Sequence, residues 1–134
     1  MWLLDTMVIS ELRKREPDPH VVAWLSTISP NQLFLSVVTI SEIQRGIIQQ
    51  RMKDAVFAEK LQLWLENLVH NYADRILPIT QEIATQWGNL SAQVGHDGPD
   101  VMIAATALHH GYTVVTRNIR HFSHFPVKTQ NPYV

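Results

Sequence analysis

The sequence predicts an α/β protein, a three-layer α/β/α domain with a mostly parallel sheet of four to five strands. Two observations support this fold class. Short apolar runs alternate with helix-forming segments along the chain, and each run is apolar nearly throughout. Strands of parallel sheets are apolar nearly throughout because helices cover both faces of the sheet.

The first element is a strand at residues 2–4, an apolar run that ends at Asp5. A helix begins directly after this strand. A second helix follows, in which Asp18 is expected as the N-cap and Pro19 as the first helical residue. Its apolar residues recur at helical spacing between 21 and 28.

The strand-to-helix step is then repeated. Residues 33–35 are the next buried strand, and apolar side chains at helical spacing between 40 and 48 predict a helix. The segment from Thr39 to Glu42 has the form of a capping box, which would place Glu42 in the first helical turn. A long amphipathic helix is expected at 54–72.

The second half of the chain continues the alternation and ends in strands. The predicted elements are a strand at 75–79, a helix capped by Thr80 that runs to Leu90, an apolar helix at 101–108 that Gly111 ends, a β-branched strand at 113–116 and an edge strand near Val127. No repeat, linker or low-complexity segment interrupts this order.

Length, composition and charge limit the classes of protein that fit. We expect a single domain spanning 1–134, because 134 residues with 46% hydrophobic content fill one core. The net charge of −1 excludes a global positive field that would attract nucleic acid from a distance. Residues 6–8 lack the glycines of a dinucleotide-binding turn, and position 7 lacks the second aspartate of aspartyl phosphatases.

The compartment expected from the sequence is the cytoplasm. The chain has no cysteine, which excludes disulfides and thiolate metal sites, and the lack of disulfides is compatible with a reducing compartment. The N-terminus lacks the basic start and long apolar region of a signal peptide. No apolar stretch approaches the roughly 18 residues that cross a bilayer, so no membrane association is expected.

Three acidic residues are the candidates for a chemical site. Asp5 follows the first strand, Glu42 lies in the helix after the second, and Asp100 begins the helix before the 113–116 strand. Ligands of parallel sheets bind beyond the carboxyl ends of the strands, where all three acids can meet. Grouped carboxylates repel one another unless a cation neutralises them, and an oxygen-rich site suits Mg²⁺ or Mn²⁺. Such an ion activates water for phosphodiester hydrolysis.

An alternative explanation for these acids stays open at this level. The N-terminus of a helix attracts negative charge, so each acid can be an ordinary capping residue. The spacing of the three residues does not decide between capping and metal binding.

Four segments resemble the four motifs of VapC- and FitB-type PIN domains, in the same order. They are residues 4–13 (LDTMVISELR), 36–46 (SVVTISEIQRG), 100–107 (DVMIAATA) and 116–122 (TRNIRHF). The resemblance implies a PIN-like fold and a Mg²⁺- or Mn²⁺-dependent endoribonuclease that cuts RNA as the toxin of a toxin–antitoxin module. It also implies a VapB-like antitoxin, a homodimer and further assembly with the antitoxin.

Carried over residue by residue, the resemblance assigns Asp5, Glu42 and Asp100 to the metal site, and it assigns Asn118 as a weaker fourth catalytic contributor. The sequence departs from the family at Met7, where an asparagine is usual, and at His121, where an acid is usual. Because this corner carries less negative charge, one tightly held metal ion is expected rather than two.

The remaining polar residues near these motifs keep two interpretations each. Asp97 is either a stand-in ligand or a turn residue. Arg117 and Arg120 either hold substrate phosphates through bidentate pairing or lie on the solvated surface. The altered fourth motif also leaves an alternative function, a PIN-fold binding module with weak or no nuclease activity that acts by binding antitoxin or RNA.

Overall fold

A computed structural model describes all 134 residues, and its sheet has five parallel strands in the order β3-β2-β1-β4-β5. The strands are β1 (Trp2–Leu4), β2 (Leu33–Ser36), β3 (Ile76–Leu77), β4 (Thr113–Val115) and β5 (Thr129–Gln130). The N-terminal strand is central, with Leu3 opposite Phe34 on one side and Val114 on the other. The expected parallel α/β sheet is confirmed.

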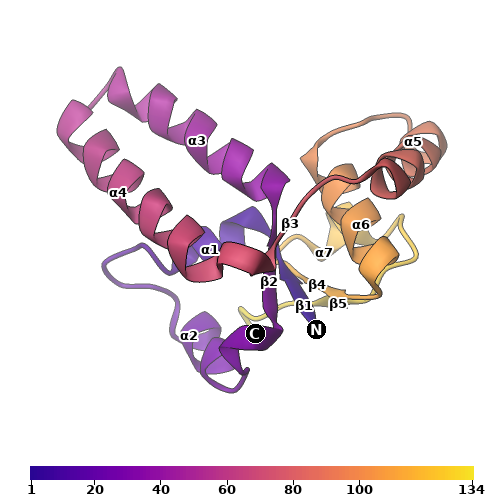
Figure 1. The fold of residues 1–134 in the computed structure, drawn as a ribbon. Helices are drawn as coiled ribbons and strands as arrows, with labels where there is room; N and C mark the ends of the chain where they lie inside the picture. Colours follow the sequence, from indigo (N-terminus) through magenta and orange to yellow (C-terminus); the bar gives the residue numbers. More distant parts are fainter.

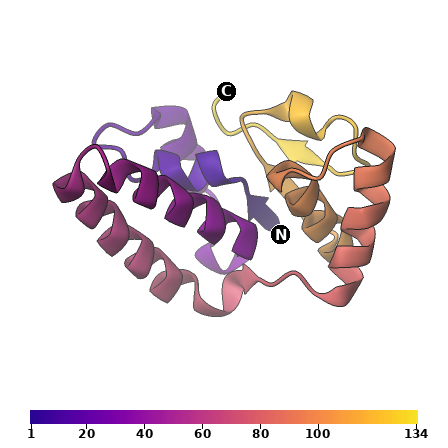
Figure 2. The ribbon, with the colours of Figure 1, turned by 90° about the horizontal axis from the view of Figure 1, so that it is seen from above.

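Helices cover both faces of this sheet. They are α1 (Thr6–Glu11), α2 (Pro19–Ser26), α3 (Val37–Arg51), α4 (Ala55–Tyr72), α5 (Gln81–Val94), α6 (Pro99–His110) and α7 (Ile119–Phe122), with short 3-10 turns η1 (Pro30–Gln32) and η2 (Ala73–Arg75). The pair α3 and α4 extends on one side of the sheet, and the pair α5 and α6 packs on the other (Figure 1). The view from above shows the two helix pairs separated by the strands (Figure 2).

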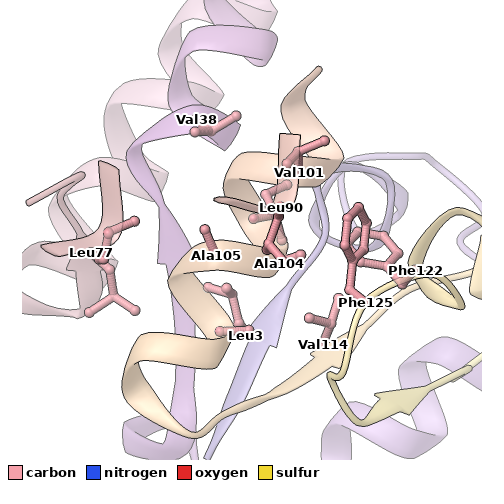
Figure 3. Packing of buried hydrophobic residues seen from close by; sticks show 13 residues of the cluster. Leu3, Val38, Leu77, Leu90, Val101, Ala104, Ala105, Val114, Phe122 and Phe125 are labelled. Carbon is pink, nitrogen blue, oxygen red and sulfur yellow. The ribbon is translucent and has the colours of Figure 1, made fainter. Parts of the chain in front are cut away.

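Two apolar cores explain why the strands are apolar throughout. Alternate side chains of one strand point to opposite faces, so Leu3 and Val114 belong to the core under α5, α6 and α7. Figure 3 shows this cluster around α6. Leu4 and Val115 belong to the second core, beneath α1 to α4. All four side chains are fully buried.

Several predicted helix ends are confirmed by their caps. Asp18 accepts a hydrogen bond from the backbone N–H of His20 at 2.8 Å, and Pro19 is the first residue of α2. The Thr80 hydroxyl accepts from the backbone of Ile83 at 3.2 Å. Gly111 ends α6 with a positive φ of 72°, a left-handed conformation that glycine adopts without steric cost.

The capping box predicted at Thr39 and Glu42 is wrong. Helix α3 begins at Val37, and its N-cap is Ser36, whose hydroxyl accepts from the backbone N–H of Val38 at 3.0 Å. The helix starts this early because Ser36 ends β2 in an extended conformation with its side chain free to cap. Glu42 therefore lies in the second turn and has no capping role.

Two strand boundaries also differ from the prediction. Strand β3 covers 76–77 rather than 75–79, because Arg75 belongs to η2 and Pro78 has no N–H to donate to a neighbouring strand. Strand β5 lies at 129–130, two residues beyond Val127. No helix has the length and apolar character needed to cross a bilayer.

Candidate active site

Asp5 is held at the carboxyl end of the central strand by three hydrogen bonds. Its backbone N–H donates to the carbonyl of Val115 at 2.9 Å, which extends the pairing of β1 with β4. Its Oδ1 accepts from the backbone N–H of Thr6 at 2.8 Å, and its Oδ2 accepts from the hydroxyl of Thr116 at 2.8 Å. These bonds fix the carboxylate between two neighbouring strands.

Glu42 is tied to the same region through two threonines. The hydroxyl of Thr6, the first residue of α1, donates to Glu42 Oε1 at 2.6 Å. Because the Thr6 hydroxyl proton is donated to Glu42, Thr6 Oγ1 acts as the acceptor for the buried Thr39 hydroxyl, 2.9 Å away. The pair therefore links α1 to α3 and orients the Glu42 carboxylate.

Asp100 lies in the first turn of α6, and its carboxylate has no capping role there. The N-cap residue of this helix is Gly98, which has no side chain to cap it. A Cβ atom at position 98 would lie 3.2 Å from Asp100 Oδ1, so glycine leaves the carboxylate room. This carboxylate keeps its oxygens available for a ligand.

All three acids line one cavity of about 480 Å³. Its lining residues are Asp5, Thr6, Met7, Glu42, His96, Pro99, Asp100, Ile103, Asn118, His121 and Phe122. Asp5 is the N-cap of α1, and Asp100 lies in the first turn of α6, where the helix dipole favours negative charge, whereas Glu42 has neither role. These residues are up to 117 positions apart in the chain, between Asp5 and Phe122, and the carboxyl edge of the sheet brings them together.

The charge on Asp5 is disfavoured in this environment. Burial raises the pKa of Asp5, and repulsion from Asp100 acts in the same direction. The hydrogen bonds from Thr116 and Thr6 lower the pKa, as does the positive potential of His121, but they do not cancel the effect of burial. A bound cation would relieve this cost because it stabilises the ionised carboxylate.

The donor set fits a hard divalent cation. Carboxylate oxygens of Asp5, Glu42 and Asp100, with the amide of Asn118, are the ligand types that Mg²⁺ and Mn²⁺ prefer. No three or more histidine, aspartate or glutamate side chains lie close enough together in this structure to hold a metal ion jointly. Mg²⁺ usually keeps several waters and binds through one or two carboxylates, so this open arrangement suits it. When bound, such an ion polarises phosphoryl oxygens and activates water.

Comparisons with known proteins identify the family. A model of the PIN domain matches residues 2–128. The chain belongs to the PIN-domain family. Among curated proteins, this PIN domain is similar to toxin FitB of Neisseria gonorrhoeae, 32% identical over 140 aligned positions that cover 99% of each chain. It is also 33% identical to VapC ribonuclease Y4jK of Sinorhizobium fredii, with 99% of this chain and 98% of that protein covered.

Solved structures also include chains that are similar to this PIN domain. The FitAcB structure from Neisseria gonorrhoeae contains a chain that matches this PIN domain with a TM-score of 0.87 and 32% identity, covering 99% of both chains. The structure of VapBC2 from Rickettsia felis bound to a promoter DNA fragment matches with a TM-score of 0.75 at 22% identity, covering 97% of both chains. The more distant match supports the three-layer fold alone.

The fourth motif of this PIN domain forms a corner of the cavity without a carboxylate. The amide nitrogen of Asn118 donates to Met7 Sδ at 3.4 Å, so Asn118 contacts one of the two residues that depart from the family pattern. A thioether is a weak acceptor, and it leaves the Asn118 amide oxygen free. His121 lines the cavity near Asp5.

Three residues singled out from the sequence lie outside this cavity. The Arg117 guanidinium lies 4.8 Å from the ring centroid of Tyr133, a cation–π contact with the C-terminal segment. Arg120 and Asp97 are exposed and do not line the cavity. The structure therefore places none of the three in the lining of the acidic cavity, and phosphate binding by Arg117 and Arg120 stays a prediction.

The sequence interpretation missed Thr6, Thr116 and His96. Thr116 directly follows β4, and Thr6 is the first residue of α1, one position after Asp5. Neither residue carries a charge, so the search for grouped acids does not select them. His96 precedes α6 and lines the cavity, while its Nδ1 accepts from the Gly98 backbone at 3.4 Å. No sequence signal distinguishes it from the other histidines.

Proposed function

We propose that this PIN domain is a metal-dependent endoribonuclease, the toxin of a VapBC-type toxin–antitoxin module that acts in the cytoplasm. The single observation that carries the proposal is the common cavity of Asp5, Glu42 and Asp100 at the carboxyl edge of the sheet. Curated relatives that span the whole chain are named a toxin and a ribonuclease, which supports the same activity.

In the proposed site Asp5, Glu42 and Asp100 hold one Mg²⁺ or Mn²⁺ ion, and Asn118 is a weaker fourth contributor. Thr116 and Thr6 act as positioning residues, because their hydroxyls orient the carboxylates of Asp5 and Glu42. Ordered carboxylates lower the cost of assembling the ligands around an ion.

The test is cleavage of RNA by the purified protein, free of any antitoxin, with Mg²⁺ or Mn²⁺. We expect cleavage that stops on chelation of the metal and in Asp5→Asn and Asp100→Asn, while circular dichroism and thermal unfolding show that both variants fold. Asp97→Asn is the matched control, because Asp97 carries the same charge near the site but does not line the cavity. Cleavage by both cavity variants at the wild-type rate would refute the proposal.

The proposed partner is a VapB-like antitoxin, and the proposed assembly is a homodimer that forms a larger complex with it. The proposal is supported by the structure of FitAB bound to a DNA fragment, which contains a chain 30% identical to this PIN domain. Co-expression with a neighbouring small reading frame, followed by light scattering of the purified material, tests both the partner and the stoichiometry.

A binding module without nuclease activity is the second candidate. It is favoured by one observation, the corner of Met7, Asn118 and His121, which supplies no carboxylate. Tight binding of the antitoxin or RNA by a chain that never cleaves RNA under any divalent metal would support this alternative.

A further inference from the structure

A second cavity lies beside the acidic one, between α3 and the start of α6. Its volume is about 430 Å³, within the usual range of ligand pockets. The residues that line it are Val37, Val38, Ser41, Glu42, Arg45, Gly46, Gln49, Pro99 and Met102. Because Glu42 and Pro99 line both cavities, an extended ligand bound at the acidic site reaches the second cavity directly.

The helix α3 side of this cavity is polar. Ser41, Arg45 and Gln49 are four residues apart, so they form one stripe along the helix. Arg45 is exposed, and it has no ion-pair partner, since the two salt bridges of the chain join Lys14 to Glu11 and His20 to Asp18. Its guanidinium is free to pair with a phosphate.

The rest of the lining is largely apolar. Val37, Pro99 and Met102 present hydrocarbon and thioether groups to the cavity. A nucleobase has apolar faces and hydrogen-bonding edges, so such a wall beside a polar stripe matches its chemistry.

A cationic side chain beside the acidic cavity would favour RNA binding. The acidic cavity is lined by three carboxylates and by no lysine or arginine, so by itself it repels a polyanion. Among the residues that line the two adjacent cavities, Arg45 is the single lysine or arginine. Arg117 and Arg120 line neither cavity.

We propose that the cavity between α3 and α6 binds the RNA nucleotide next to the one whose phosphodiester is cut. In this subsite Arg45 pairs with the backbone phosphate, and the wall of Val37 and Met102 contacts the base. The inference rests on the proposed ribonuclease function, because it assigns the neighbouring nucleotide of the same substrate.

The first test measures binding of a fluorescent single-stranded RNA oligonucleotide by anisotropy, in an Asp100→Asn background that prevents cleavage. We expect Arg45→Gln to weaken binding about tenfold, the effect of one charge-assisted pair worth about 1.4 kcal/mol. The slope of log Kd against log salt should fall by about 0.7, the value for one phosphate contact on a single strand. Arg51→Gln is the matched control, since it removes the same charge from the exposed C-terminal end of α3.

The second test observes the cavity directly through methionine methyl groups in NMR spectra. On addition of the same RNA, we expect the Met102 methyl resonance to shift, while that of Met52, which is 88% exposed at the far end of α3, stays in place. A Met102 signal that does not move at saturating RNA overturns the proposed base contact.

The outcomes separate the two proposals. Cleavage by wild type combined with equal RNA affinity of Arg45→Gln and Arg51→Gln overturns the subsite and leaves the nuclease standing. RNA binding that depends on Arg45, combined with a wild-type chain that cleaves no RNA under any divalent metal, supports RNA binding at this cavity but overturns the nuclease and the assignment to a cleaved substrate. Absence of RNA binding by the Asp100→Asn chain overturns the subsite.

Discussion

Replacing Thr116 by valine tests how the Asp5 carboxylate is held. Thr116 is fully buried, its hydroxyl donates to Asp5 Oδ2 at 2.8 Å, and its Oγ1 accepts from the backbone N–H of Asn118 at 3.0 Å. Valine has the same shape but makes neither bond. A hydrogen bond to a charged group contributes about 1.5–3 kcal/mol, and an unpaired buried N–H costs about 1–3 kcal/mol. Because the added methyl group offsets part of this loss, we expect Thr116→Val to lower the free energy of unfolding by about 3 kcal/mol.

Thr116→Ser is the matched control for this prediction, because it keeps both hydrogen bonds and removes one methyl group, which costs about 1 kcal/mol. Urea unfolding at neutral pH measures both variants, and the melting temperature of Thr116→Val should fall by about 10 °C. Calorimetric titration with Mn²⁺ should show weaker binding to Thr116→Val, since loss of the hydrogen bond raises the pKa of Asp5 further. Equal stability of the valine and serine variants would refute the reasoning.

Three further predictions concern stability. The Lys14 side chain and the Asp18 backbone N–H hold the pKa of Glu11 below its ordinary value. Its contribution to stability is therefore present at neutral pH and is lost as the pH falls through this lowered pKa. Glu11→Gln should therefore cost about 1–2 kcal/mol at pH 7 in urea unfolding, and the difference should shrink at pH 3.5. The Arg75 guanidinium donates to three backbone carbonyls at 2.6 to 2.9 Å. Arg75→Lys should therefore lower the free energy of unfolding by about 2 kcal/mol in the same assay. An unchanged free energy of unfolding in the lysine variant would show that these bonds are dispensable. Gly111→Ala should lower the free energy of unfolding by about 1 kcal/mol, because a residue with a Cβ atom is strained at the φ of 72° that Gly111 adopts. An alanine variant as stable as wild type would contradict this prediction.

Most of the fold could be predicted from the sequence because the deciding signals are local. The apolar run at Trp2–Leu4, the cap at Asp18 and the glycine at 111 each depend on residues within a few positions. The start of α3 is not encoded locally, because Ser36 and Thr39 are both capable caps and the choice between them depends on where β2 ends. That end is set by pairing with β1 and β3, which local sequence does not encode.

The candidate site could be predicted only in part. Asp5 was found because it follows a buried strand, and the position of Asp100 followed from the helix that begins at Pro99. The bond from Thr6 to Glu42 joins residues 36 positions apart on two helices, so only the packing of those helices reveals it. The role of Arg45 required the neighbouring cavity, to which α6 contributes residues more than 50 positions away.

The altered fourth motif and the proposed Arg45 subsite are linked by charge. Three ionised carboxylates and one divalent ion leave a net charge of about −1 in the cavity, which still opposes an incoming phosphate. A fourth carboxylate at this corner would attract a second metal ion, but Asn118 is neutral and contacts Met7. A site with one ion therefore needs another cation near the substrate, and Arg45 lies beside Glu42 in the adjoining cavity. If metal titration gave two tightly bound ions per chain, this requirement would disappear, and Arg45→Gln should then have little effect on RNA affinity.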